Sequence, residues 1–266
     1  MSSAESSIRS SLLLVVVILS VCAWTITYYQ CTNMGILMQL GVPMSLGMEG
    51  HANSRSLETF VGMWLVMMMA MMLPSTYPTL LLYRTVSRNR TRRPAFATLL
   101  FGLGYFLTWT ASGILFYAAF LVTGAIRESV PGGNVTVLRG AAACLILAGL
   151  YQWSPFKRAC LRHCQSPFHF VSEHWRDGFS GAFRMGIQHG MFCFGCCWGL
   201  MVALGVLGIM HLGWMAAIGA VILLEKFVPS RSWVAQISGA LFVLAGILIF
   251  AFPWILGWLS SQVTIA

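Results

Sequence analysis

The chain has 266 residues, of which 58% are hydrophobic and only 9% are charged. Its mean hydropathy of +0.78 excludes a soluble protein built around one core and indicates a chain embedded in a membrane. The net charge of +9 comes mostly from Lys and Arg gathered in a few loops, as membrane topology requires. Nucleic-acid binding is therefore not expected.

Long intervals without charge locate the membrane spans, because a helix that crosses a bilayer needs ~20 apolar residues. The interval from Arg184 to Glu225 is about two bilayers long, so the chain must turn inside it, and the stretch from Gly208 to Gly213 is the natural place. We therefore predict an all-α polytopic membrane helix bundle of about seven transmembrane helices. The spans are expected near residues 11–30, 59–82, 96–123, 136–154, 184–208, 212–228 and 234–259.

The distribution of Lys and Arg predicts the orientation of the spans. Both are densest in the loops that follow the second and fourth spans, and such loops stay in the cytoplasm. The N-terminus is therefore expected inside and the C-terminus outside. The chain reads as one integral membrane domain over residues 1–266, with a Met-rich outer loop at 31–58 and a basic inner loop containing Cys and His at 155–183.

Ten of the 16 methionines lie between residues 34 and 72. Met63, Met67 and Met71 recur every four residues, so they form one strip along the second span. Thioethers are soft ligands that favour Cu(I), although methionine is also a common filler between packed helices. Pro74 and Pro78 follow and predict a kink. The candidate ligands of this group are Met44, Met48 and His51 in the outer loop and Met67 and Met71 in the span.

The fifth span carries a denser set of soft donors. His189, Cys193 and Cys196 fall within a sector of roughly 60° on a helix, so their donor atoms are expected to converge. Cys197 adds a third thiol, and Met201 one turn further on is a secondary candidate. A single buried cysteine is usually a small hydrophobic residue, but three of them just after a histidine favour metal binding or redox chemistry.

The inner loop adds Cys160 and Cys164, with a histidine between them and two more histidines after them. Thiols in a reducing cytoplasm favour metal binding or redox exchange over a structural disulfide. Basic neighbours such as Lys157 are expected to favour the thiolate. Glu225 at the end of the sixth span is a further candidate, although an ion pair with the adjacent Lys226 is the favoured explanation.

Two segments carry a family resemblance. They are Ala70-Met71-Met72-Leu73-Pro74 in the second span and Cys193-Phe194-Gly195-Cys196-Cys197-Trp198 in the fifth. From about Leu57 to Val228 the chain resembles a bacterial family of predicted metal-binding integral membrane proteins, catalogued as a domain of unknown function. The resemblance implies metal binding and a multi-pass protein of the bacterial inner (cytoplasmic) membrane, and it supplies no reaction.

The preferred hypothesis is a membrane protein that takes up, transfers or loads Cu(I), with other soft or transition metals left open. Copper would be captured in the outer loop, descend the methionine strip, and pass the thiols of the fifth span and His189 to reach Cys160 and Cys164. A metal donor or acceptor protein or a copper enzyme subunit would be the partner. No catalytic residue set is assigned, so we expect a binding protein rather than an enzyme.

Two other functions stay open at this point. Cys193 and Cys196 also form a Cys-x-x-Cys pair, which suits a membrane thiol–disulfide electron carrier. Such a carrier does not need the methionine strip. A haem or iron-binding membrane subunit could use His189 as a ligand, but the sequence lacks an obvious pair of histidines on facing spans.

Overall fold

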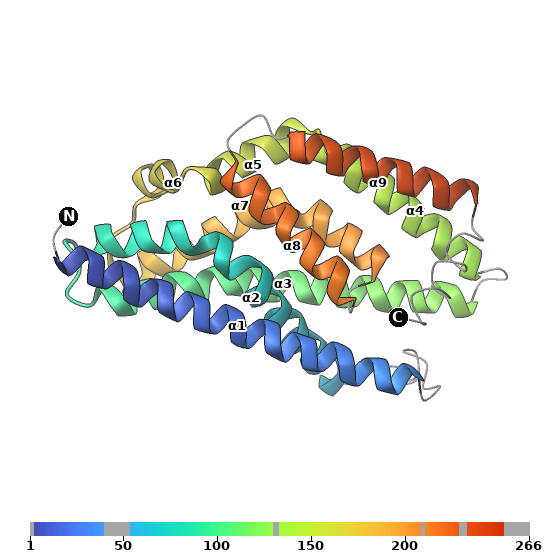
Figure 1. Ribbon diagram of the computed structural model, residues 1–266, viewed down its shortest axis with the longest axis horizontal. Coiled ribbons are helices and arrows are strands. Elements are labelled where there is room, and N and C mark those ends of the chain that lie inside the picture. Colours follow the sequence, from blue (N-terminus) through green and yellow to red (C-terminus); the bar gives the residue numbers. More distant parts are fainter. Residues whose placement is uncertain (1–2, 40–53, 130–132, 209–210, 229–232, 253–266) are drawn as a thin grey trace. The chain divides into compact units, whose positions relative to one another are not determined.

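The computed structural model describes residues 3–39, 54–129, 133–208, 211–228 and 233–252 (Figure 1). All regular structure in these ranges is helical, which confirms the all-α prediction. The helices are α1 (Ser3–Gln39), α2 (Ser54–Ser87), α3 (Pro94–Ser129), α4 (Gly133–Gln152), α5 (Pro155–Gln165), α6 (Pro167–His174), α7 (Gly178–Leu207), α8 (Leu212–Phe227) and α9 (Trp233–Ala251).

Six of these helices are long and apolar enough to cross a membrane, namely α1, α2, α3, α4, α7 and α9. The remaining predicted span corresponds to α8, whose 16 residues extend about 24 Å, less than the ~30 Å of a bilayer core. The expected turn before it is present, since Gly208 has a φ of 119°. His211 then caps α8 by accepting a hydrogen bond from the backbone N–H of Trp214 at 3.3 Å.

Both predicted long loops contain more helix than expected. α1 continues to Gln39 and α2 begins at Ser54, so the predicted outer loop at 31–58 is helical at both ends. The predicted inner loop at 155–183 contains α5, α6 and the first turn of α7. Pro155 and Pro167 begin α5 and α6, where the missing N–H of proline leaves no hydrogen bond unmade.

Pro74 and Pro78 lie inside α2, which remains one helix from Ser54 to Ser87 and bends along its length (Figure 1). A proline inside a helix removes one backbone hydrogen bond and pushes the preceding turn aside, so the bend follows from the sequence. Beside it, the hydroxyls of Ser75 and Thr76 both donate to the carbonyl of Met72, at 2.8 and 2.9 Å.

The chain forms two compact units, and α7 runs through both. Unit 1 comprises Met1–Tyr117 and Arg162–Phe194, and unit 2 comprises Ala118–Leu161 and Gly195–Ala266. The buried core of unit 1 draws on five helices, so α2 and α7 share one core. Its residues are Val16, Leu73, Leu80, Tyr83, Ala97, Phe101, Phe170, Val171, Ala182 and Met185.

In unit 2, α4 lies along α9 (Figure 1). Glycines permit this close approach, since a Cβ added to Gly149 would lie 2.6 Å from the carbonyl oxygen of Gly239. Small residues are a common means of bringing membrane helices together. A second buried cluster holds Ala142, Leu145, Ala203 and Ile249.

Candidate metal centre

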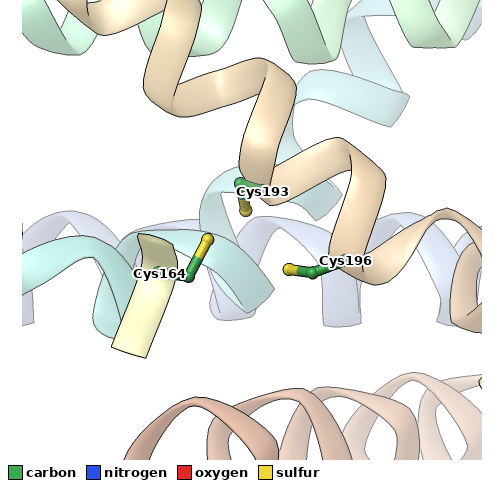
Figure 2. A group of neighbouring side chains, drawn as sticks. All are labelled: Cys164, Cys193 and Cys196. Carbon is green, nitrogen blue, oxygen red and sulfur yellow. The ribbon is translucent and has the colours of Figure 1, made fainter. Parts of the chain in front are cut away.

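Three cysteine thiols meet inside the protein. Cys164 lies near the end of α5, and Cys193 and Cys196 lie on α7. Their Sγ atoms are all within 4.8 Å of one another, and all three side chains are buried. Figure 2 shows the three sulfur atoms pointing toward one common space.

Helix geometry brings two of these thiols together. Cys193 and Cys196 are three residues apart on α7, and residues with that spacing share a helix face. Both residues belong to α7, which is one helix from Gly178 to Leu207. The third thiol comes from α5, in a segment that sequence reasoning placed beyond this cluster.

The three sulfurs suit a soft metal ion. Metal–thiolate bonds of about 2.3 Å in a trigonal arrangement place the sulfurs about 4 Å apart, and the three sulfurs here all lie within 4.8 Å of one another. Thiolates select Cu(I) and other soft ions, so the donor chemistry of this group fits copper.

Two further groups lie against the thiols. The hydroxyl oxygen of Tyr105 is 3.1 Å from the Sγ of Cys193, and both groups are buried. The Sγ of Cys197 is 3.2 Å from that of Cys196. Tyr105 is a polar neighbour of the cluster that the sequence analysis did not consider, because it belongs to α3 and no local pattern connects it to the cysteines.

His189 is buried on α7 but is not part of the group of three thiols. Its ring packs among those of Phe101, Tyr105 and Phe170, with ring centroids 5.9, 5.7 and 4.9 Å away. The helical period predicted that it shares one sector with the two cysteines. The structure adds that aromatic rings of α3 and α6 lie against the histidine.

Cys160 also lies outside the group of three thiols, although it is buried. Its Sγ faces α7 where a Cβ added to Gly195 would be only 2.7 Å away. Burial raises the pKa of the Cys160 thiol, so at this residue the expectation that basic neighbours would favour the thiolate is wrong. The ammonium group of Lys157 contacts the carboxylate of Glu225, and the guanidinium group of Arg158 donates a hydrogen bond to the backbone carbonyl of Trp153.

Lys157 forms an ion pair with Glu225 that was not predicted. Its Nζ is 2.7 Å from Oε2 and 2.9 Å from Oε1 of Glu225, and each side chain is only 1% exposed. The same Nζ donates to the side-chain oxygen of Gln152. Glu225 thus has a basic partner besides the adjacent Lys226, because α5 brings in a lysine 68 residues away in the sequence.

The methionine candidates separate into two groups. Met67 and Met71 on α2 are 3% and 2% exposed, and Met201 on α7 is 1% exposed. Met44, Met48 and His51 lie outside the described residues.

A second group of donor atoms lies at α5 and α6. It consists of His163, His169 and Glu173, whose ligand atoms are within 4.8 Å of one another. Burial is the main cause that lowers the pKa of His163, followed by the charges of His174 and His169. The histidines of this group were apparent in the sequence, whereas Glu173 was not predicted, although it lies at i, i+4 from His169 on the same helix.

Residues 61–249 match the PpoB2 family, which is described as a copper chaperone. Neither the curated proteins nor the solved structures contain a match. The matched range spans most of the chain and includes most of α2 and all of α5 and α7, which carry the methionine strip and the thiol cluster. The family description agrees with the soft donor set and supports a copper-related metal-binding role. The chain belongs to the PpoB2 copper chaperone family.

Proposed function

We propose that the protein binds Cu(I) at Cys164, Cys193 and Cys196 within the membrane and transfers it to a copper-dependent partner. The observation that carries this proposal is the convergence of three buried thiols from two helices. Together with membership of a copper chaperone family, this arrangement supports Cu(I) rather than a harder ion.

The thiol cluster is suited to holding copper securely but reversibly. Three sulfur donors match the low coordination number of a soft monovalent ion, and Cys197 supplies a neighbouring thiol 3.2 Å from Cys196 that can take over one bond during transfer. The Tyr105 hydroxyl at Cys193 is placed to stabilise the metal-bound sulfur through a hydrogen bond.

The buried methionines support a route to this cluster. Met67, Met68, Met71 and Met72 are all buried on α2, a helix that shares a core with α7. We propose that Cu(I) enters along these thioethers from the outer side and reaches the thiols from there. Under this proposal Cys164 is a ligand of the central site rather than a later station of the route.

The proposed location is the bacterial inner membrane, with the N-terminus inside and the chain acting as a single membrane domain. The proposed partner is a copper enzyme subunit or another copper carrier. The haem alternative is disfavoured by the packing of Phe101, Tyr105 and Phe170 around His189, because an axial ligand needs open space beside it.

Copper binding to the detergent-purified full chain tests the proposal. The protein is loaded with Cu(I) under anaerobic reducing conditions, and its affinity is measured by competition with a chromogenic Cu(I) chelator. We expect Cys164→Ser and Cys193→Ser each to lower the affinity by more than the roughly 10- to 100-fold that is typical of an outer-shell change. X-ray absorption of the copper-loaded protein should show a sulfur first shell.

Cys144→Ser is the matched control, since Cys144 is an exposed cysteine on α4. It should bind Cu(I) as the unmodified protein does. Unchanged affinity in both cluster variants would refute the proposed ligands. If instead no copper binds and a disulfide between Cys193 and Cys196 forms and breaks with added oxidant and reductant, the electron-carrier function replaces the copper function.

A further inference from the structure

The group formed by His163, His169 and Glu173 lies outside the thiol cluster and combines two helices. His169 and Glu173 are one turn apart on α6, with Nε2 3.2 Å from Oε2. His163 comes from α5 and stacks on His169, with ring centroids 5.7 Å apart and an angle of 13° between the ring planes.

An ordinary surface ion pair accounts for only part of this arrangement. His169 and Glu173 are 52% and 48% exposed, and an exposed i, i+4 pair contributes only about 0.3–0.5 kcal/mol. Such a pair does not explain why a third donor, His163, lies beside these two side chains. The ring of His163 is held against that of Phe192 on α7, with centroids 4.1 Å apart. Within the described part of the chain, Nδ1 of His163 is buried and has no hydrogen-bond partner.

We propose that His163, His169 and Glu173 form a second metal site, which binds a divalent transition-metal ion. Two imidazoles and a carboxylate are borderline-hard donors that suit Cu(II), Zn(II) and Ni(II), and among these Cu(II) binds such sets most tightly. The ion takes the place of the direct contact between His169 and Glu173 and gains the third ligand from α5. This site contains no thiol, so the metal ions that it prefers differ from those that the buried thiol cluster prefers.

Two residues of this region directly precede ligands of the thiol cluster in the chain. His163 precedes Cys164 directly on α5, and Phe192 precedes Cys193 on α7. The site therefore adjoins two of the thiol ligands along the chain, while two of its own donors, His169 and Glu173, are about half exposed. The protein thus offers two neighbouring sites of different chemistry, and the second stands whether or not the thiols bind Cu(I).

Titration of the detergent-purified full chain with Co(II) alone tests this site, because cobalt reports its ligands by absorption. A thiolate ligand produces a sulfur-to-metal charge-transfer band, whereas imidazole and carboxylate ligands give only ligand-field bands. We expect ligand-field bands without the charge-transfer band at the first equivalent. His169→Ala and Glu173→Gln should each weaken Co(II) binding by about tenfold or more.

Three controls separate this proposal from its neighbours. His211→Ala and Glu128→Gln alter an exposed histidine and an exposed carboxylate elsewhere and should leave Co(II) binding unchanged. Cys193→Ser should keep the Co(II) site even where Cu(I) binding is lost. Co(II) binding that survives both His169→Ala and Glu173→Gln overturns the site, as does binding accompanied throughout by the thiolate band. Because both replaced side chains are about half exposed, an unchanged melting temperature is expected and shows that folding is intact.

Discussion

Replacing Lys157 with methionine removes one partner of the most deeply buried ion pair that the structure describes. The Nζ atom lies 2.7 Å from Glu225, and both side chains are 1% exposed. At an effective dielectric of about 20, Coulomb attraction at this separation is roughly 6 kcal/mol, and most of it offsets the cost of removing two charges from water. Without the lysine that cost remains, so Lys157→Met should destabilise the protein by about 3–5 kcal/mol.

Replacing both Lys157 and Glu225 distinguishes the loss of the ion pair from the cost of leaving one of its charges buried alone. In Lys157→Met/Glu225→Met neither charge of this pair stays buried, and the side-chain oxygen of Gln152 loses its donor. An unsatisfied buried acceptor costs about 1–3 kcal/mol, so the double variant should be more stable than Lys157→Met alone.

Thermal unfolding in detergent measures these differences. For a protein near this size, 1 kcal/mol corresponds to roughly 2–4 °C, so Lys157→Met should lower the melting temperature by roughly 6–20 °C. Glu225→Met should behave similarly. Two results refute the reasoning: single variants within about 1 kcal/mol of the parent, or a double variant whose loss equals the sum of the two single losses.

Two further predictions concern α3 and α7. Gly186→Ala should destabilise the protein by more than about 2 kcal/mol, because the added Cβ would lie 2.0 Å from the backbone oxygen of Phe101. At Gly102 an added Cβ meets nothing within 4 Å, so Gly102→Ala should be neutral or slightly stabilising in the same melting experiment. Tyr105→Phe should weaken Cu(I) binding by about 10- to 100-fold with little change in melting temperature, since it removes only the hydroxyl 3.1 Å from Cys193. An unaltered affinity in the chelator competition would argue against a hydrogen bond from Tyr105 to the metal-bound sulfur.

Helical class and most spans were predictable because they depend on local properties of the chain. Uncharged intervals and apolar composition located α1, α2, α3, α4, α7 and α9. The predictions were weakest at helix ends, where α1 and α7 extend further than expected. Residues beyond a span stay helical wherever no strong helix-breaking residue intervenes, and hydropathy does not report that.

Local spacing also predicted two of the three thiols of the candidate site. Cys193 and Cys196 share a face of α7 because of the helical period alone. The same spacing placed His189 with them, but its surroundings are aromatic rings from α3 and α6. Which side chains fill the space opposite a helix face depends on its neighbours.

The sequence by itself determined a helical membrane protein with soft donors on two of its helices, since hydrophobicity and periodicity are properties of each segment. Only the tertiary structure decided that Cys164 completes a group of three thiols and that Lys157 pairs with Glu225 rather than acting on Cys160. Both outcomes require α5 to pack at a particular place. Packing between distant segments depends on their shapes and on the pairing of buried charges, and the spacing of residues along one segment predicts neither.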